Sequence, residues 1–188
     1  MAIQEHHRQE LLALARRAVE AAVRGQGLIK PPSAEGIAGE IRGCFVTLKN
    51  GPHLRGCIGT FQPRAPLGRL ICEMALAAAT QDPRFFHDPV TPDELPALRV
   101  EVSVLSPLEL TDDPASLTVG VHGIYIVRDG YAGCFLPEVA TEMGWSAREF
   151  LDNCCSHKAG LPPGAWRDGD TQVYLFTSEK FEEPQISR

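Results

Sequence analysis

Arg55 and Cys57 are the residues whose types and spacing best suit chemistry. They stand two apart in Leu54-Arg55-Gly56-Cys57-Ile58-Gly59, an apolar stretch that favours a β-strand. Residues two apart in a strand point to the same face, so a guanidinium would lie beside a thiol. A neighbouring positive charge lowers the pKa of a thiol and favours the nucleophilic thiolate. Gly56 and Gly59 would let a ligand or another backbone come close.

These residues also have a structural interpretation, which the sequence leaves open. A free cysteine is often a small buried side chain, and a glycine in a strand often marks a β-bulge. Under that interpretation Cys57 belongs to the core and the two glycines only shape the strand.

Four further residues extend the candidate site. His122, with Arg55 and Cys57, completes the catalytic candidates, because an imidazole could activate the thiol. Asp82, Arg84 and His53, with Gly56 and Gly59, are the candidates for binding a substrate. Each has an alternative: Asp82 could cap a turn, Arg84 could pair with a structural carboxylate, and His122 could be an ordinary edge histidine.

Local patterns place these residues on predicted elements. Apolar residues at helical spacing predict amphipathic helices over residues 5–24 and 67–80. Asn50-Gly51 predicts a hairpin turn between strands at 45–48 and 54–58, and alternation predicts a strand over 98–105. Capping boxes begin at Thr91 and Ser146, the second opening a helix to about residue 158. Further strands are expected at 121–127, 131–136 and 172–176, with a short helix at 137–143.

The two halves of the chain resemble each other. The glycine-flanked hairpin from Gly43 to Ile58 matches the stretch from Gly123 to Phe135, and a helix follows each. We therefore expect an α+β fold: two related hairpin-helix units merged into one curved, mainly antiparallel sheet with helices outside. A single domain over 1–188 would comprise a helix and linker at 1–38, a first unit at 39–110 and a second at 111–188. Arg55 has alanine as its counterpart, so the reactive site should lie in the first unit.

Composition excludes several classes of protein. The 188 residues carry 18 basic and 24 acidic side chains, a net charge of −6, which disfavours nucleic-acid binding. The six cysteines include no C-x-x-C pair or radical-SAM cluster triplet, so neither a metal site nor a bound cofactor is predicted. Met1 to His6 does not open a signal peptide, and no apolar run is long enough to span a membrane. We expect a cytoplasmic protein with reduced thiols.

The hexapeptide from Leu54 to Gly59 resembles the hallmark motif of the AMMECR family, the Alport syndrome, midface hypoplasia and elliptocytosis chromosomal-region proteins. Prokaryotic members are called AmmeMemoRadiSam system protein A. Other segments resemble the family's motifs in the same order, over about Gly39 to Phe181: Asp82-Pro83-Arg84-Phe85, Glu101-Val102-Ser103-Val104-Leu105-Ser106, His122-Gly123, Leu136-Pro137-Glu138-Val139-Ala140, Gly144-Trp145 and Lys158-Ala159-Gly160-Leu161.

The resemblance implies the fold, a candidate site and a genomic setting beside Memo-like and radical-SAM proteins. It leaves two functions open. The first is an enzyme, or a component of one, that binds a small substrate in a cleft around the hexapeptide. The alternative is a non-catalytic binding or adaptor module for a protein partner.

Overall fold

The computed structural model describes residues 2–31 and 35–184. The chain divides into two compact units, the first of residues 1–105 and 179–188, the second of residues 106–178. The chain therefore passes from the first unit to the second after Leu105, a few residues before the boundary that the sequence suggested at 110. Each unit has a four-stranded sheet and its own apolar core.

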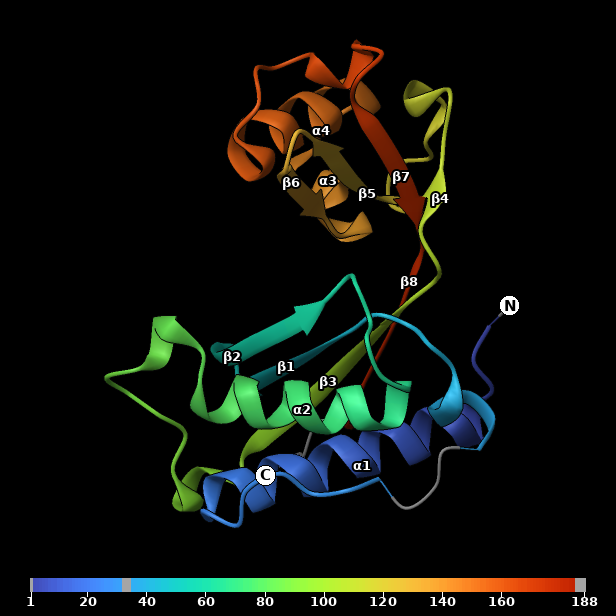
Figure 1. The fold of residues 1–188 in the computed structure, drawn as a ribbon. Coiled ribbons are helices and arrows are strands. Elements are labelled where there is room, and N and C mark those ends of the chain that lie inside the picture. Colours follow the sequence, from blue (N-terminus) through green and yellow to red (C-terminus); the bar gives the residue numbers. More distant parts are fainter. Residues whose placement is uncertain (1, 32–34, 185–188) are drawn as a thin grey trace. The chain divides into compact units, whose positions relative to one another are not determined.

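The first unit has a sheet of strand order β2-β1-β3-β8 (Figure 1). Two long helices, α1 and α2, pack on each other and on this sheet. Short 3-10 turns at Gly36–Gly39, Pro83–Phe85 and Pro92–Glu94 connect these elements. The bounds are α1 Glu5–Val23, β1 Cys44–Asn50, β2 His53–Thr60, α2 Leu67–Thr80, β3 Leu98–Leu105 and β8 Ser178–Glu182.

Alternation decides which face of this sheet is apolar. Val46, Leu48, Val100 and Val102 have no exposed surface and join the core with the buried stripes of α1 and α2. The β1–β2 turn places Gly51 at a φ of 57°, a left-handed conformation that suits glycine. The predicted helices, hairpin and third strand are confirmed, with ends within a few residues of those expected.

The second unit has a sheet of order β4-β7-β5-β6. Ser146 and Glu149 form the predicted capping box, and Gly160 ends the helical segment with a φ of 69°. That segment changes from α-helix to π-helix after Cys154. The bounds are β4 Glu109–Leu110, β5 Gly123–Arg128, β6 Tyr131–Phe135, α3 Pro137–Met143, α4 Ala147–Cys154, the π-helix Cys155–Ala159 and β7 Gln172–Phe176, with 3-10 turns at Pro114–Ser116 and Ala165–Arg167.

The α+β class with antiparallel strands is confirmed, but the prediction of one merged, curved sheet needs correction. The strands form two separate four-stranded sheets. Each hairpin packs on a helix of its own unit, and each sheet gains a fourth strand, β8 or β4, that the sequence analysis did not predict. No helix in the described part of the chain is long and apolar enough to cross a membrane.

Candidate functional site

Cys57 lies in the middle of β2, which is an edge strand of the first sheet. It pairs with Thr47 on β1, and Thr47 pairs with Glu101 on β3. Directly paired residues share a face of a sheet, so a thiol, a hydroxyl and a carboxylate form one row across three strands. The Thr47 hydroxyl donates a hydrogen bond to Cys57 Sγ at 3.3 Å. We call these three residues the Cys57 row.

The thiol of Cys57 is neither sealed in the core nor fully exposed. Ile58, next along the strand, packs against the core cluster, as does the helix-facing side of Gly56. Alternation along β2 therefore directs Cys57 to the face opposite Gly56 and Ile58, which is the face away from α2.

The backbone of Cys57 points to the free edge of the sheet, where Asp82 and Arg84 bind it. Its N–H donates to Asp82 Oδ2 at 2.9 Å, and its carbonyl oxygen accepts from Arg84 Nη2 at 3.2 Å. An acceptor and a donor thus stand where a further strand would pair. Edge strands with unsatisfied backbone groups promote association, and this side-chain pair covers one such position.

The Asp82 carboxylate is buried and takes part in a dense set of hydrogen bonds. Besides Cys57, the backbone N–H of Arg84 donates to it at 3.1 Å, and the Arg84 guanidinium donates at 3.0 and 2.7 Å. The hydrogen bonds from the guanidinium, opposed in part by burial and assisted by the Cys57 N–H, lower the pKa of Asp82 to about 2. Asp82 is therefore an anion that also caps the 3-10 turn at Pro83–Phe85.

Arg55 is held by the same loop but not by the thiol. The β1–β2 register shifts between Leu48 and Lys49, which makes Arg55 the extra residue of a β-bulge and interrupts the predicted alternation. Its guanidinium binds Asp88 at 2.6 Å and Glu94 at 3.1 Å.

Phe85 connects the two guanidinium groups of the site. The central carbon of Arg55 lies 5.9 Å from the Phe85 ring centroid, and that of Arg84 lies 5.6 Å from it. Both distances are within the range of cation–π attraction. The ring therefore helps to keep two positive charges near the edge of β2.

The two glycines of the hexapeptide are needed for packing inside the first unit. A Cβ on Gly56 would lie 2.0 Å from the carbonyl oxygen of Ala78 on α2. A Cβ on Gly59 would lie 2.3 Å from the ring of Phe45. The sequence indicated that a ligand or another backbone could come close to these glycines. In the structure, the groups that come close are the Ala78 carbonyl and the Phe45 ring.

Neither histidine candidate belongs to this loop. His53 is an exposed residue at the start of β2, where it pairs with Asn50. His122 belongs to the second unit, where its Nδ1 accepts a hydrogen bond from the backbone N–H of Thr118 at 3.0 Å. The structure therefore brings Asp82 and Arg84 to the backbone of Cys57 and pairs Arg55 with Asp88 and Glu94, whereas the proposed role of His122 stays a prediction.

Glu101 is a site residue that the sequence analysis did not select. Its carboxylate is buried and forms ion pairs with Lys49 at 2.8 Å and Lys180 at 3.6 Å. Two signals could have identified it: the alternation over 98–105 puts it on the polar face, and it opens one of the recurring motifs. What the sequence could not show is its alignment with Thr47 and Cys57.

The matching positions of the second unit carry different chemistry. Cys134 pairs with Tyr125, and Tyr125 pairs with Tyr174, so two phenols stand where the first unit has a hydroxyl and a carboxylate. Burial raises the pKa of Cys134 to about 11. The duplication therefore stays a prediction, and the polar row is a feature of the first unit.

Space for a ligand near this loop is limited. A cavity of about 100 Å³ lies beside Asp82, Phe85 and Phe86, between the loop and the end of α2. Among the described residues, no group of three or more histidine, cysteine, aspartate or glutamate side chains could hold a metal ion.

A two-unit α+β fold with a glycine-flanked cysteine on an edge strand defines the class of protein. The AMMECR1 family model matches residues 12–181, and the chain belongs to this family. A protein of Methanothermobacter thermautotrophicus is 46% identical over 180 residues, which are 92% of each chain. One of Thermococcus kodakarensis is 47% identical over 184 residues, covering 92% of this chain and 88% of the relative. A crystal structure of an uncharacterized protein from Pyrococcus horikoshii superposes with a TM-score of 0.86 at 41% identity, covering 97% of this chain and 94% of that one.

Proposed function

We propose that this AMMECR1-family protein is an enzyme, or a component of one, that binds a small substrate beside Cys57 and uses the Cys57 thiol. The observation that carries the proposal is the hydrogen bond from the Thr47 hydroxyl to Sγ. A donor aimed at sulfur stabilises the thiolate relative to the thiol. The sulfur is also held in place, because Asp82 and Arg84 bind both backbone polar groups of the same residue.

The substrate class proposed is a small anion. Arg84 keeps 54% of its side chain exposed, and its Nη1 donates to no described residue. A guanidinium with free donors is well suited to bind a carboxylate or phosphate oxygen.

Alkylation by iodoacetamide, mapped by mass spectrometry at pH 7, tests the thiol directly. Cys134 is the internal control, since it is also partly exposed but lies beside Tyr125 and has a raised pKa. We expect Cys57 to react at least about tenfold faster than Cys134 and faster than free cysteine. Thr47→Val, which keeps the shape and removes the donor, should slow the reaction of Cys57 alone. A Cys57 that reacts no faster than free cysteine would exclude an activated thiol.

The alternative function, a non-catalytic module that binds a protein partner, is favoured by Phe86. This side chain is 77% exposed and follows the loop residues that bind Cys57. Large apolar side chains at the surface often mark contact sites. The family setting makes Memo-like and radical-SAM proteins the partners to test by calorimetry at micromolar concentration. Loss of that binding in Phe86→Ala, with Cys57 alkylation unchanged, would support the module over the enzyme.

A further inference from the structure

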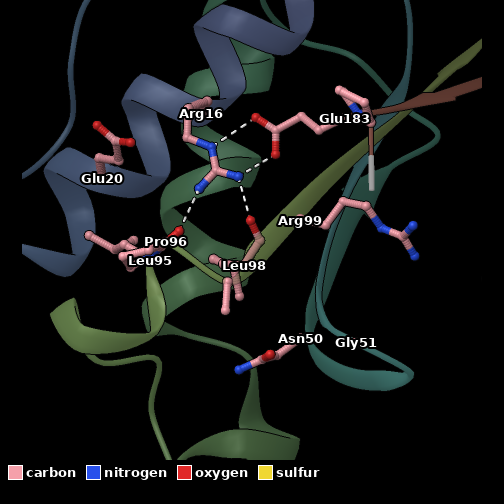
Figure 2. Close-up of a pocket in the computed structure, with 11 residues that line it drawn as sticks. Arg16, Glu20, Asn50, Gly51, Leu95, Pro96, Leu98, Arg99 and Glu183 are labelled. Atoms are coloured by element: carbon pink, nitrogen blue, oxygen red, sulfur yellow. Dashed lines mark hydrogen bonds and ion pairs between the residues drawn. The ribbon is translucent and has the colours of Figure 1, made fainter. Parts of the chain in front are cut away.

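A larger cavity of the first unit, of about 730 Å³, shares no lining residue with the Cys57 row. Its walls come from α1, the β1–β2 turn, the segment before β3 and the residues after β8 (Figure 2). Its volume falls within the range of small-molecule sites, about 300 to 1,000 Å³. Figure 2 shows Glu20 and Asn50 on different walls of this cavity.

Arg16 holds the walls together. Its Nη1 donates to the Leu95 carbonyl oxygen at 3.2 Å, and its Nη2 donates to the Leu98 carbonyl oxygen. The same guanidinium forms a bidentate ion pair with Glu183, whose backbone N–H also donates to Val100 at 3.0 Å. The cavity is therefore built around a partly buried charge pair whose hydrogen bonds are made within the protein.

The other charged residues that line the cavity differ in whether they have a charged partner. Arg99 has a partner in Glu182, at 3.5 Å. Glu20 lies one helical turn after Arg16 on α1, and its carboxylate has no hydrogen bond or ion pair with any residue that the structure describes. The side chain of Asn50 likewise has no such partner within the described chain. Among the charged lining residues that the structure describes, Glu20 is thus the one without a charged partner.

We propose that this cavity binds a small organic cation, an aliphatic primary amine, whose ammonium group contacts Glu20. The ammonium donates to the carboxylate, and the hydrocarbon body lies against the segment Leu95–Leu98. That segment supplies a leucine, a proline, an alanine and a second leucine. This site is independent of the proposed chemistry at Cys57.

The test compares two probes of the same shape, cyclohexylmethylamine and cyclohexylmethanol, by calorimetry or NMR titration at pH 7. The amine is protonated there and the alcohol is neutral, so their affinity ratio reports the contribution of Glu20. A hydrogen bond to a charged group predicts that the amine binds at least about tenfold more tightly. Glu20→Gln should abolish this ratio. Glu10→Gln, the same change at an exposed position of α1, should retain it.

A second variant locates the site independently of charge. Ala97→Phe places a ring in the cavity and should abolish binding of both probes, in a protein whose unfolding midpoint shows that it is folded. Equal affinity for amine and alcohol would overturn the proposal, as would a preference that survives Glu20→Gln or binding that survives Ala97→Phe. Cys57 alkylation should be the same in all three variants, so failure here and failure of the proposed thiol chemistry are separate results.

Discussion

Asp82→Asn is the substitution that most directly tests how the candidate site is built. The carboxylate accepts from the Cys57 N–H and from three donors of Arg84. An asparagine has one acceptor oxygen, and its NH₂ group must face either Cys57 or Arg84, both of which donate. A buried donor without an acceptor costs about 1 to 3 kcal/mol, so we expect the free energy of unfolding to fall by about 2 kcal/mol.

The pH dependence of stability follows from the same carboxylate. Its pKa is lowered from 3.8 to about 2, chiefly by the Arg84 guanidinium. A lowered pKa means that the folded state prefers the anion, so this stabilisation is present above pH 3.8 and is lost as the pH falls toward 2. The full difference would correspond to about 2.5 kcal/mol at about 1.36 kcal/mol per pH unit. Because water screens the half-exposed Arg84, we expect about 1 kcal/mol.

Urea unfolding at several pH values between 7 and 2.5 measures both effects. Asp88→Asn is the matched control, because it removes a carboxylate that pairs with Arg55 but keeps 77% of its side chain exposed. An exposed pair contributes about 0 to 1 kcal/mol, so this variant should stay near wild type. The reasoning is refuted if Asp82→Asn is no less stable than Asp88→Asn, or if its stability falls with acid as steeply as that of the wild type.

Other predictions concern packing and have simple readouts. Gly56→Ala should destabilise the protein by about 3 kcal/mol, because its Cβ would lie 2.0 Å from the backbone of Ala78. Gly169→Ala has no atom within 4 Å of its Cβ and should change stability by less than about 1 kcal/mol. Phe150→Ala, at a fully buried position of the second unit, should cost about 3 to 5 kcal/mol. Chemical denaturation of each variant tests these values, and a Gly56→Ala protein as stable as Gly169→Ala would contradict the packing argument.

Elements whose signals are local could be predicted from the sequence. The capping box at Ser146 and the Asn50-Gly51 turn depend on residues within a few positions, and both appear where expected. β8 could not be predicted, because Ser178–Glu182 is mostly polar and joins a sheet whose other strands end at Leu105. Its pairing depends on residues that are distant in the sequence.

The candidate site shows the same difference between local features, which the sequence predicts, and long-range contacts, which it does not. The side of the sheet that Cys57 faces follows from alternation, which is a local property. The bulge at Arg55 and the bond from Cys57 to Asp82, 25 positions away, are long-range features. The sequence therefore identified residues that meet at the loop, but it could not show that Arg84 binds Asp82 through Nε and Nη2.

The main chemical question at this site is whether the Cys57 thiol is reactive. The Asp82 carboxylate accepts a hydrogen bond from the Cys57 N–H at the edge of the sheet, and the Arg55 guanidinium forms ion pairs with Asp88 and Glu94. If Cys57 were only a packing residue, Thr47 could be valine without consequence, as at many paired positions in a sheet. The hydroxyl instead donates to Sγ, so the alkylation rate of Thr47→Val separates a functional thiol from a structural one, whatever the identity of the substrate.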